Sequence, residues 1–246
     1  KCTRILVHSI ADLNRLKDIG LVENVALFPH GIIDTFNCNK NITPTIHFNK
    51  SNHHISIASY GFCLPNKGFS ELVKAIAILK KSKYSIKLNL FTSIYNKDYE
   101  YYYHDLIQLI KQLNVEDLVT INTEYLSLED VQSFLSKHDL IVFPYQPNTQ
   151  ESSSAAVRDG LASLQPVLVT PLSIFDDVSE LVNYLPGTTP LDIATGILDW
   201  ITEKSNDSLN SEKKNDQRLK KINQRRFSRL SIRLTSLIRS LEINHI

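Results

Sequence analysis

Apolar and polar positions along this chain follow two different periods. Residues 140–143 and 167–169 are continuous apolar runs, which are typical of parallel strands buried on both faces. Residues 86–92 alternate apolar and polar positions, as a strand does, whereas residues 69–81 place apolar side chains three and four positions apart, as a helix does. The two patterns follow one another along the chain, which indicates alternating strands and helices.

The predicted elements alternate from end to end. Strands are expected at 4–8, 24–28, 55–60, 86–92, 118–121, 140–143 and 167–169. Helices are expected at 11–19, 69–81, 99–113, 127–135, from 152–154 to about 163, and 191–201. Ser9 is the expected cap of the first helix, and Ser127 and Asp130 have capping-box spacing. This order predicts an α/β fold with a Rossmann-like, doubly wound parallel sheet.

The pattern also divides the chain. Residues 1–32 form a short strand–helix–strand unit, and residues 33–54, rich in Asn, Thr, Pro and Lys, are expected to be a linker or loop. Residues 55–205 carry the main sheet, and residues 206–246 contain a basic C-terminal helix, expected over 213–241. Because the chain has no Met and begins almost inside a strand, we expect a fragment of a longer protein.

Composition narrows the function classes. A net charge of +1, from 27 basic and 26 acidic residues, argues against a nucleic-acid-binding surface. The three cysteines have no metal-ligand spacing, and the simplest interpretation is a reduced, cytoplasmic setting. There is no signal peptide and no apolar run near ~18 residues, so the sequence predicts no membrane span.

Two segments carry candidate chemistry, and both follow predicted strands. Ligands bind such sheets outside the carboxyl ends of the strands, where Gly61, Lys67 and Glu151 are all expected. Gly61 allows close approach of a ligand to the backbone, and Lys67 can pair with a diphosphate. Glu151 precedes a helix start whose amides can bind phosphate, and Asp159 lies about two turns inside that helix. A phosphate site between two carboxylates suits a nucleotide-sugar, although each residue could also be an ordinary surface or capping residue.

With these residues the chain resembles the C-terminal, donor-binding half of retaining glycosyltransferases with the GT-B fold, of glycosyltransferase family four. The matching pieces are 29–31, Gly61, Lys67 with Gly68, 143–145, Glu151, Asp159, 166–170 and the basic C-terminal helix. Segments 152–158 and 170–177 are most similar to bacterial polysaccharide or O-antigen (lipopolysaccharide) mannosyltransferases. The resemblance implies transfer of a hexose, with mannose the candidate, from a GDP- or UDP-sugar to a glycan or lipid-linked acceptor. It also implies that the N-terminal acceptor domain is mostly missing and that residues 1–32 are a remnant of it.

The resemblance assigns roles to individual residues. Lys67 would bind the donor diphosphate, and Glu151 would face the donor sugar, which makes these two the catalytic candidates. Ser153 and Ser154 would offer backbone amides to the phosphates, and Asp159 would bind the ribose hydroxyls. The loop that contains Tyr125 and Leu126 matches the position of the base. No metal is required if the cation and the amides stabilise the leaving diphosphate.

The sequence departs from the family pattern at two positions. Asp159 replaces the usual Glu, and Phe62 stands where many members have Arg, with Arg158 a possible substitute cation or a solvent-exposed residue. Loss of that Arg leaves open a non-catalytic nucleotide-sugar-binding module, and a sugar-nucleotide epimerase of the same fold is a further alternative. Retention of configuration is implied by the resemblance alone.

The C-terminal helix has two interpretations. Its apolar residues recur three and four positions apart between many basic ones, so it can pack on the protein with its arginines in solvent. A basic amphipathic helix can also bind an anionic membrane, here the inner face of the plasma membrane.

Overall fold

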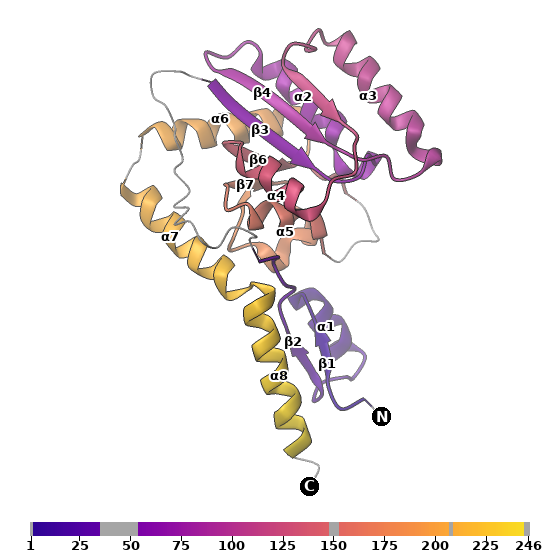
Figure 1. Ribbon diagram of the computed structural model, residues 1–246, viewed down its shortest axis with the longest axis vertical. Helices are drawn as coiled ribbons and strands as arrows, with labels where there is room; N and C mark the ends of the chain where they lie inside the picture. Colours follow the sequence, from indigo (N-terminus) through magenta and orange to yellow (C-terminus); the bar gives the residue numbers. More distant parts are fainter. Residues whose placement is uncertain (1, 35–53, 148–152, 207–208, 244–246) are drawn as a thin grey trace.

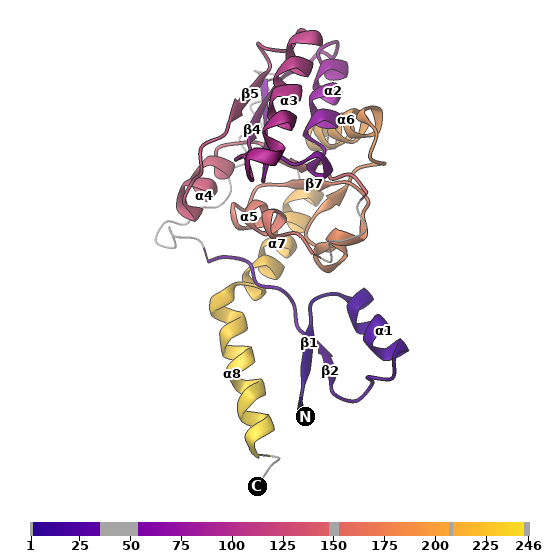
Figure 2. The ribbon, with the colours of Figure 1, turned by 90° about the vertical axis from the view of Figure 1, so that its right-hand side faces the viewer.

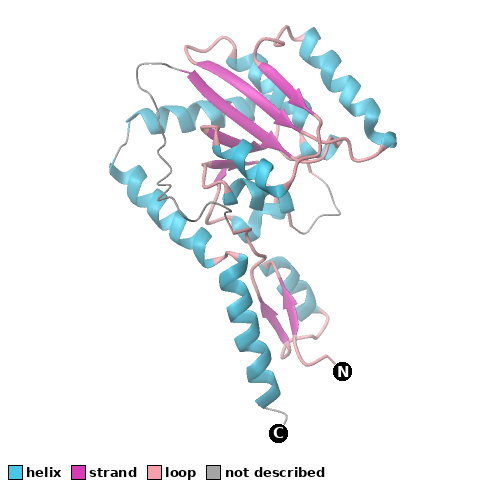
Figure 3. Cartoon of the chain, in the orientation of Figure 1, coloured by secondary structure: helices cyan, strands magenta, loops and turns pink. Residues whose placement is uncertain are grey.

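The computed structural model describes residues 2–34, 54–147, 153–206 and 209–243. Its main body is a six-stranded sheet. Figures 1 and 3 show helices on both faces of this sheet. The strand order is β5-β4-β3-β6-β7-β8, and every neighbouring pair is parallel. The strands are β3 (His54–Tyr60), β4 (Ser85–Phe91), β5 (Val119–Asn122), β6 (Leu140–Phe143), β7 (Val167–Val169) and β8 (Asn183–Tyr184). The helices of this body are α2 (Phe69–Leu79), α3 (Glu100–Gln112), α4 (Leu128–Ser136), α5 (Ala155–Ala162) and α6 (Pro190–Asn206). The doubly wound parallel sheet is therefore confirmed.

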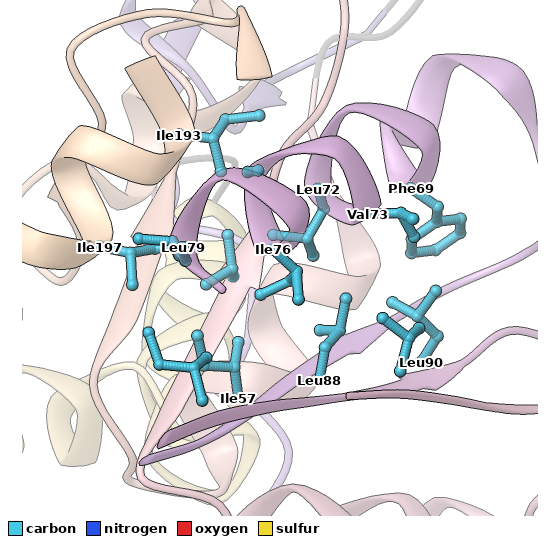
Figure 4. Packing of buried hydrophobic residues seen from close by; sticks show 14 of the residues in the cluster. Ile57, Phe69, Leu72, Val73, Ile76, Leu79, Leu88, Leu90, Ile193 and Ile197 are labelled. Atoms are coloured by element: carbon cyan, nitrogen blue, oxygen red, sulfur yellow. The ribbon is translucent and has the colours of Figure 1, made fainter. Parts of the chain in front are cut away.

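The central strands bury both of their faces, which explains their continuous apolar runs. In β3, Ile57 packs under α2 and α6, whereas its neighbour Ala58 belongs to a second cluster with residues of α4 and α5. Figure 4 shows the first layer, in which Leu88 of β4 lies below Ile76 of α2 and Ile193 of α6 is on the far side of that helix. Successive side chains of a strand point to opposite faces, so each layer needs its own apolar set.

The N-terminal residues form a separate small unit. Strands β1 (Ile5–Val7) and β2 (Val25–Leu27) pair in parallel, and α1 (Ile10–Asp18) connects them. The Ser9 side chain accepts a hydrogen bond from the Asp12 amide at 3.0 Å, which confirms the predicted cap. The second predicted cap is also confirmed, because Ser127 accepts from the Asp130 amide at 3.2 Å.

The C-terminal region is two helices, and the prediction of one continuous helix over 213–241 was wrong. Helix α7 (Leu209–Gln224) ends two residues before α8 (Phe227–Ile243) begins. Between them Ile32 forms a parallel β-bridge with Arg226, the Ile32 amide donates to Arg225 O at 2.9 Å, and the Phe227 amide donates to Ile32 O at 3.0 Å. These bonds take backbone groups that a continuous helix would use internally, so the chain turns there. Figures 1 and 2 show α8 running beside the two-stranded sheet.

Three short 3₁₀ helices and β8 have no counterpart in the sequence prediction. They are η1 (Pro65–Lys67), η2 (Lys97–Tyr99) and η3 (Ser173–Val178). The predicted linker over 33–54 falls largely on residues 35–53, which lie outside the described residues.

Gly68 lets the loop after β3 lie directly against the backbone of Pro144, in the loop after β6. It has a φ of 71°, and a Cβ at this position would overlap the backbone oxygen of Pro144. We therefore expect Gly68→Ala to lower the free energy of unfolding by on the order of 2–4 kcal/mol, because backbone strain and a backbone clash add. Urea unfolding measures this change. Gly20→Ala is the control, since Gly20 has a φ of 87° with open space around it and should cost only about 1 kcal/mol. Equal losses in the two variants would contradict the predicted clash.

Candidate functional site

The loops at the carboxyl ends of β3 and β6 meet at one crevice. Gly61 leaves β3 with a φ of 144°, and its amide donates to Phe91 O at 3.1 Å. A Cβ on Gly61 would lie 4.0 Å from the Cβ of Ala156, so the first turn of α5 lies against the exit of β3. The predicted glycine and the predicted helix start are thus neighbours.

Tyr145 connects the candidate lysine to the helix start. The Lys67 ammonium lies 4.1 Å from the centre of the Tyr145 ring, within the range of a cation–π interaction. The Tyr145 hydroxyl lies 3.0 Å from Ser154 Oγ, and Ser154 accepts a hydrogen bond from the Val157 amide at 3.3 Å. One buried ring therefore touches both the cation and the N-cap of α5. The sequence resemblance includes the 143–145 segment but assigns no role to the Tyr145 ring.

Further hydrogen bonds join the loops after β3 and β6 to each other and to neighbouring segments. The Gln146 amide donates to Asn66 O at 2.9 Å, and Gln146 Nε2 donates to Thr188 O at 3.1 Å. Thr170 Oγ1 donates to Tyr145 O at 2.8 Å, which attaches the loop after β6 to the end of β7. These bonds hold the Lys67 segment and Tyr145 in fixed register.

Asp159 is a buried acid in the second turn of α5. It is 8% exposed, and burial raises its pKa to about 6, a rise that the neighbouring Arg158 partly opposes. Burial also raises the pKa of Tyr60 to about 12, and the charge of Asp159 adds to this rise, as do Tyr125 and Tyr145. Asp159 thus shares the crevice with Tyr60, which sequence reasoning missed because a strand-end tyrosine carries no distinctive pattern.

Arg158 does not point to solvent, and its position does not suit a second diphosphate cation. Its side chain is 3% exposed and forms a salt bridge with Asp177, which is equally buried. It also donates to the Ser154 backbone oxygen, while Arg225 donates to the Asp177 backbone oxygen. Burial lowers the pKa of Arg158 and raises that of Asp177, and the attraction between the two charges opposes both shifts. A buried charge needs a partner, and Asp177 supplies it from the loop after β7.

Aromatic rings occupy the crevice edge beyond β3 and β4. Phe62 is 42% exposed and meets Tyr95 edge-to-face, with ring centres 5.1 Å apart. Tyr125, in the predicted base loop, is 84% exposed, while Leu126 is half-buried against the second core cluster. Ser93 Oγ donates to Glu124 O at 2.9 Å and joins the loops after β4 and β5.

Of the two remaining predicted site residues, the structure describes Ser153 but not Glu151. Ser153 is half-buried immediately before the cap of α5. Glu151 lies outside the described residues, so its assignment stays a prediction. Within the described ranges, no group of three or more His, Cys, Asp or Glu side chains is arranged to hold a metal ion. Within the same ranges, no helix is long and apolar enough to cross a bilayer.

Comparison with known proteins identifies the architecture. No family model and no curated protein sequence matches the chain. Among solved structures it is similar to a glycosyltransferase from Rickettsia africae, with a TM-score of 0.73, 12% identity, and coverage of 97% of this chain and 63% of that one. It is similar to Anabaena HepE in complex with UDP, with a TM-score of 0.77, 14% identity, and coverage of 97% and 64%. It is also similar to sucrose-phosphate synthase from Thermosynechococcus elongatus, with a TM-score of 0.70, 16% identity, and coverage of 99% and 59%.

The fold is that of a GT-B Rossmann-like domain. The chain spans less than two thirds of the length of each of these three proteins, 63% of the Rickettsia glycosyltransferase. At these identities the likeness establishes the fold, and the activity is taken up as a proposal below.

The raised pKa of Asp159 makes stability depend on pH. Its pKa is about 6 when folded and roughly 3.9 when unfolded, so the folded state binds more protons between these values and stability falls as pH rises through them. Asp159→Asn should therefore raise the free energy of unfolding at pH 7.5 by roughly 2–3 kcal/mol, and the gain should nearly vanish below about pH 4.

Chemical denaturation across this pH range measures the effect. Asp176→Asn, at an exposed position of η3, is the matched control and should change little. A pH-independent loss of stability in Asp159→Asn would mean that the carboxylate is stabilising and that the assignment of a raised pKa is wrong.

Proposed function

We propose that the chain is the donor-binding half of a glycosyltransferase that transfers a hexose from a nucleotide-sugar. The observation that carries the proposal is the arrangement around Tyr145, whose ring contacts Lys67 and whose hydroxyl contacts Ser154 at the start of α5. A cation and a helix N-terminus converging on the carboxyl edge of a parallel sheet form a site for a diphosphate.

The chemistry follows from where charge develops. When the bond between sugar and diphosphate breaks, negative charge builds on the leaving nucleoside diphosphate, and Lys67 would stabilise it. The Ser154 cap uses the Val157 amide, which leaves the earlier amides of the first turn of α5 for the phosphates. If the Lys67 ammonium and these oriented amides suffice to stabilise the leaving diphosphate, the departure step needs no metal.

The remaining roles follow from the family resemblance. Glu151 would face the sugar, Asp159 would bind the ribose, and the loop at Tyr125 and Leu126 would receive the base. Comparison structures in complex with UDP and with UDP-glucose support a nucleotide-sugar donor. A GDP-sugar, mannose as the hexose, retention of configuration and a role in bacterial surface polysaccharide synthesis are the finer parts of the proposal.

The acceptor side belongs to a domain that we propose precedes this chain. The unit β1-α1-β2 has exposed apolar side chains, including Ile10, Val22 and Leu27, that a larger N-terminal domain would cover. That domain would hold a glycan or lipid-linked acceptor. A trehalose-phosphate synthase from Burkholderia xenovorans, similar in fold, is in complex with glucose-6-phosphate.

A non-catalytic nucleotide-sugar-binding module is the second candidate. Phe62 and Tyr95 place an aromatic pair where a diphosphate cation is common in the family, and Arg158 is committed to Asp177. A sugar-transfer assay on the full-length protein separates the two functions, since a binding module should bind the donor without turnover.

Substitutions of Lys67 and Glu151 should change the affinities for a nucleoside diphosphate and for its nucleotide-sugar in different ways. Lys67→Ala removes the positive charge that would pair with the diphosphate. It should therefore weaken binding of both the nucleoside diphosphate and the nucleotide-sugar by on the order of 1.5–3 kcal/mol. Glu151→Ala should leave nucleoside diphosphate binding nearly unchanged and weaken the nucleotide-sugar. Calorimetric titration of both variants with UDP, GDP and their sugars measures these affinities.

Lys81→Ala is the matched control, because this exposed lysine lies at the far end of α2. If Glu151→Ala weakens binding of both ligands equally, the assignment of Glu151 to the donor sugar is wrong. Unchanged affinities in Lys67→Ala would overturn the diphosphate site itself.

A further inference from the structure

The elbow between α7 and α8 forms a groove whose described lining residues all come from these two helices. Its volume is about 690 Å³. The side chains that line it are Lys220, Asn223 and Gln224 from α7 and Arg229, Ile232 and Arg233 from α8.

The spacing of these residues explains why they face one another. Each set occupies positions i, i+3 and i+4, which lie on one face of a helix. The turn at Arg225 and Arg226, set by the β-bridge to Ile32, brings the two faces together. A continuous helix would place the two sets far apart along its axis, so the groove exists because the helix breaks.

The groove carries one sign of charge. Lys220, Arg229 and Arg233 line it, and among the residues that the structure describes no carboxylate does. Within the described part of the chain none of these three forms a salt bridge, whereas nearby Lys221 and Arg225 are both paired with Glu180. Arg233 lies 5.7 Å from the Phe28 ring, which positions it without neutralising it. The cations inside the elbow are therefore available for an anion.

An apolar side chain stands among these cations. Ile232 is 64% exposed, whereas Leu230, two positions earlier in α8, is buried. Arg239 lies two turns further along the face of Ile232 and is also exposed. Cations around a protruding isoleucine match the surface of an anionic bilayer, where basic side chains bind phosphates and an apolar one enters the acyl boundary.

We propose that the α7–α8 elbow docks this protein on an anionic phospholipid surface. Lys220, Arg229 and Arg233 bind the headgroup phosphates, and Ile232 inserts between them. The proposal rests on the shape and charge of the elbow, and it holds whether or not the chain transfers sugar.

Vesicle co-sedimentation tests the proposal with the whole chain. We expect binding to vesicles of phosphatidylcholine with 30% phosphatidylglycerol, weakening as salt rises, and no binding to phosphatidylcholine alone. Each basic residue at such a surface is worth roughly fivefold in partition, so Lys220→Gln with Arg229→Gln and Arg233→Gln should lower partition by on the order of 100-fold. Ile232→Ser should lower it by about tenfold.

A matched control removes the same charge elsewhere. Lys81→Gln with Lys87→Gln and Lys111→Gln takes three exposed cations from the other side of the molecule and should retain binding to within a fewfold. Unchanged thermal unfolding of the elbow variant shows that the loss is local. Absence of binding at low salt, or equal loss in both triple variants, would overturn the proposal. Displacement of the vesicles by millimolar inorganic phosphate would also overturn it, in favour of a site for free phosphate.

Discussion

The buried ring of Tyr145 is the contact on which the candidate site depends. It holds the Lys67 ammonium on its face and the Ser154 hydroxyl at its edge, so the loop after β3 and the helix after β6 are positioned by one side chain. Gly68 makes this possible, because only a residue without Cβ lets the lysine loop approach Pro144 so closely. The rigid parallel sheet thereby fixes the separation between a cation and a helix start.

The cost of burying charge explains the rest of the crevice. Arg158 and Asp177 are both almost inaccessible and compensate each other, which ties α5 to the loop after β7. Asp159, one residue further along α5, forms no salt bridge among the described residues, and burial raises its pKa to about 6 although the charge of Arg158 partly opposes the rise. A buried acid that lowers the stability of the fold is typical of functional sites, because its carboxyl group can bind a ligand.

The contact between Ile32 and Arg226 joins the ends of the chain. Through it the segment that leaves the N-terminal unit meets the turn between α7 and α8, and Asp34 accepts hydrogen bonds from the Ser228 amide at 3.0 Å and from the Ser228 hydroxyl at 2.6 Å. His30 lies at the same junction, where burial and then the charge of Arg158 lower its pKa, which favours the neutral imidazole. The candidate crevice and the C-terminal helices are therefore connected through one set of short contacts.

The sequence by itself determined the layered sheet, because continuous apolar runs such as 140–143 are typical of strands covered on both faces and alternate along the chain with helical periods. The caps at Ser9 and Ser127 were also predictable, because each is a hydrogen bond between residues three positions apart. The order of apolar runs along the chain likewise indicated that Gly61, Lys67 and the start of α5 follow strand ends. Only the tertiary structure decided that Arg158 is paired, that Tyr145 connects Lys67 to Ser154, and that the C-terminal helix breaks at Arg226. These features depend on partners 9 to 194 positions away in sequence, such as Tyr145 with Ser154 and Ser228 with Asp34. Local periodicity records which face of an element is buried, but it contains no information about which distant side chain or backbone group will meet that face.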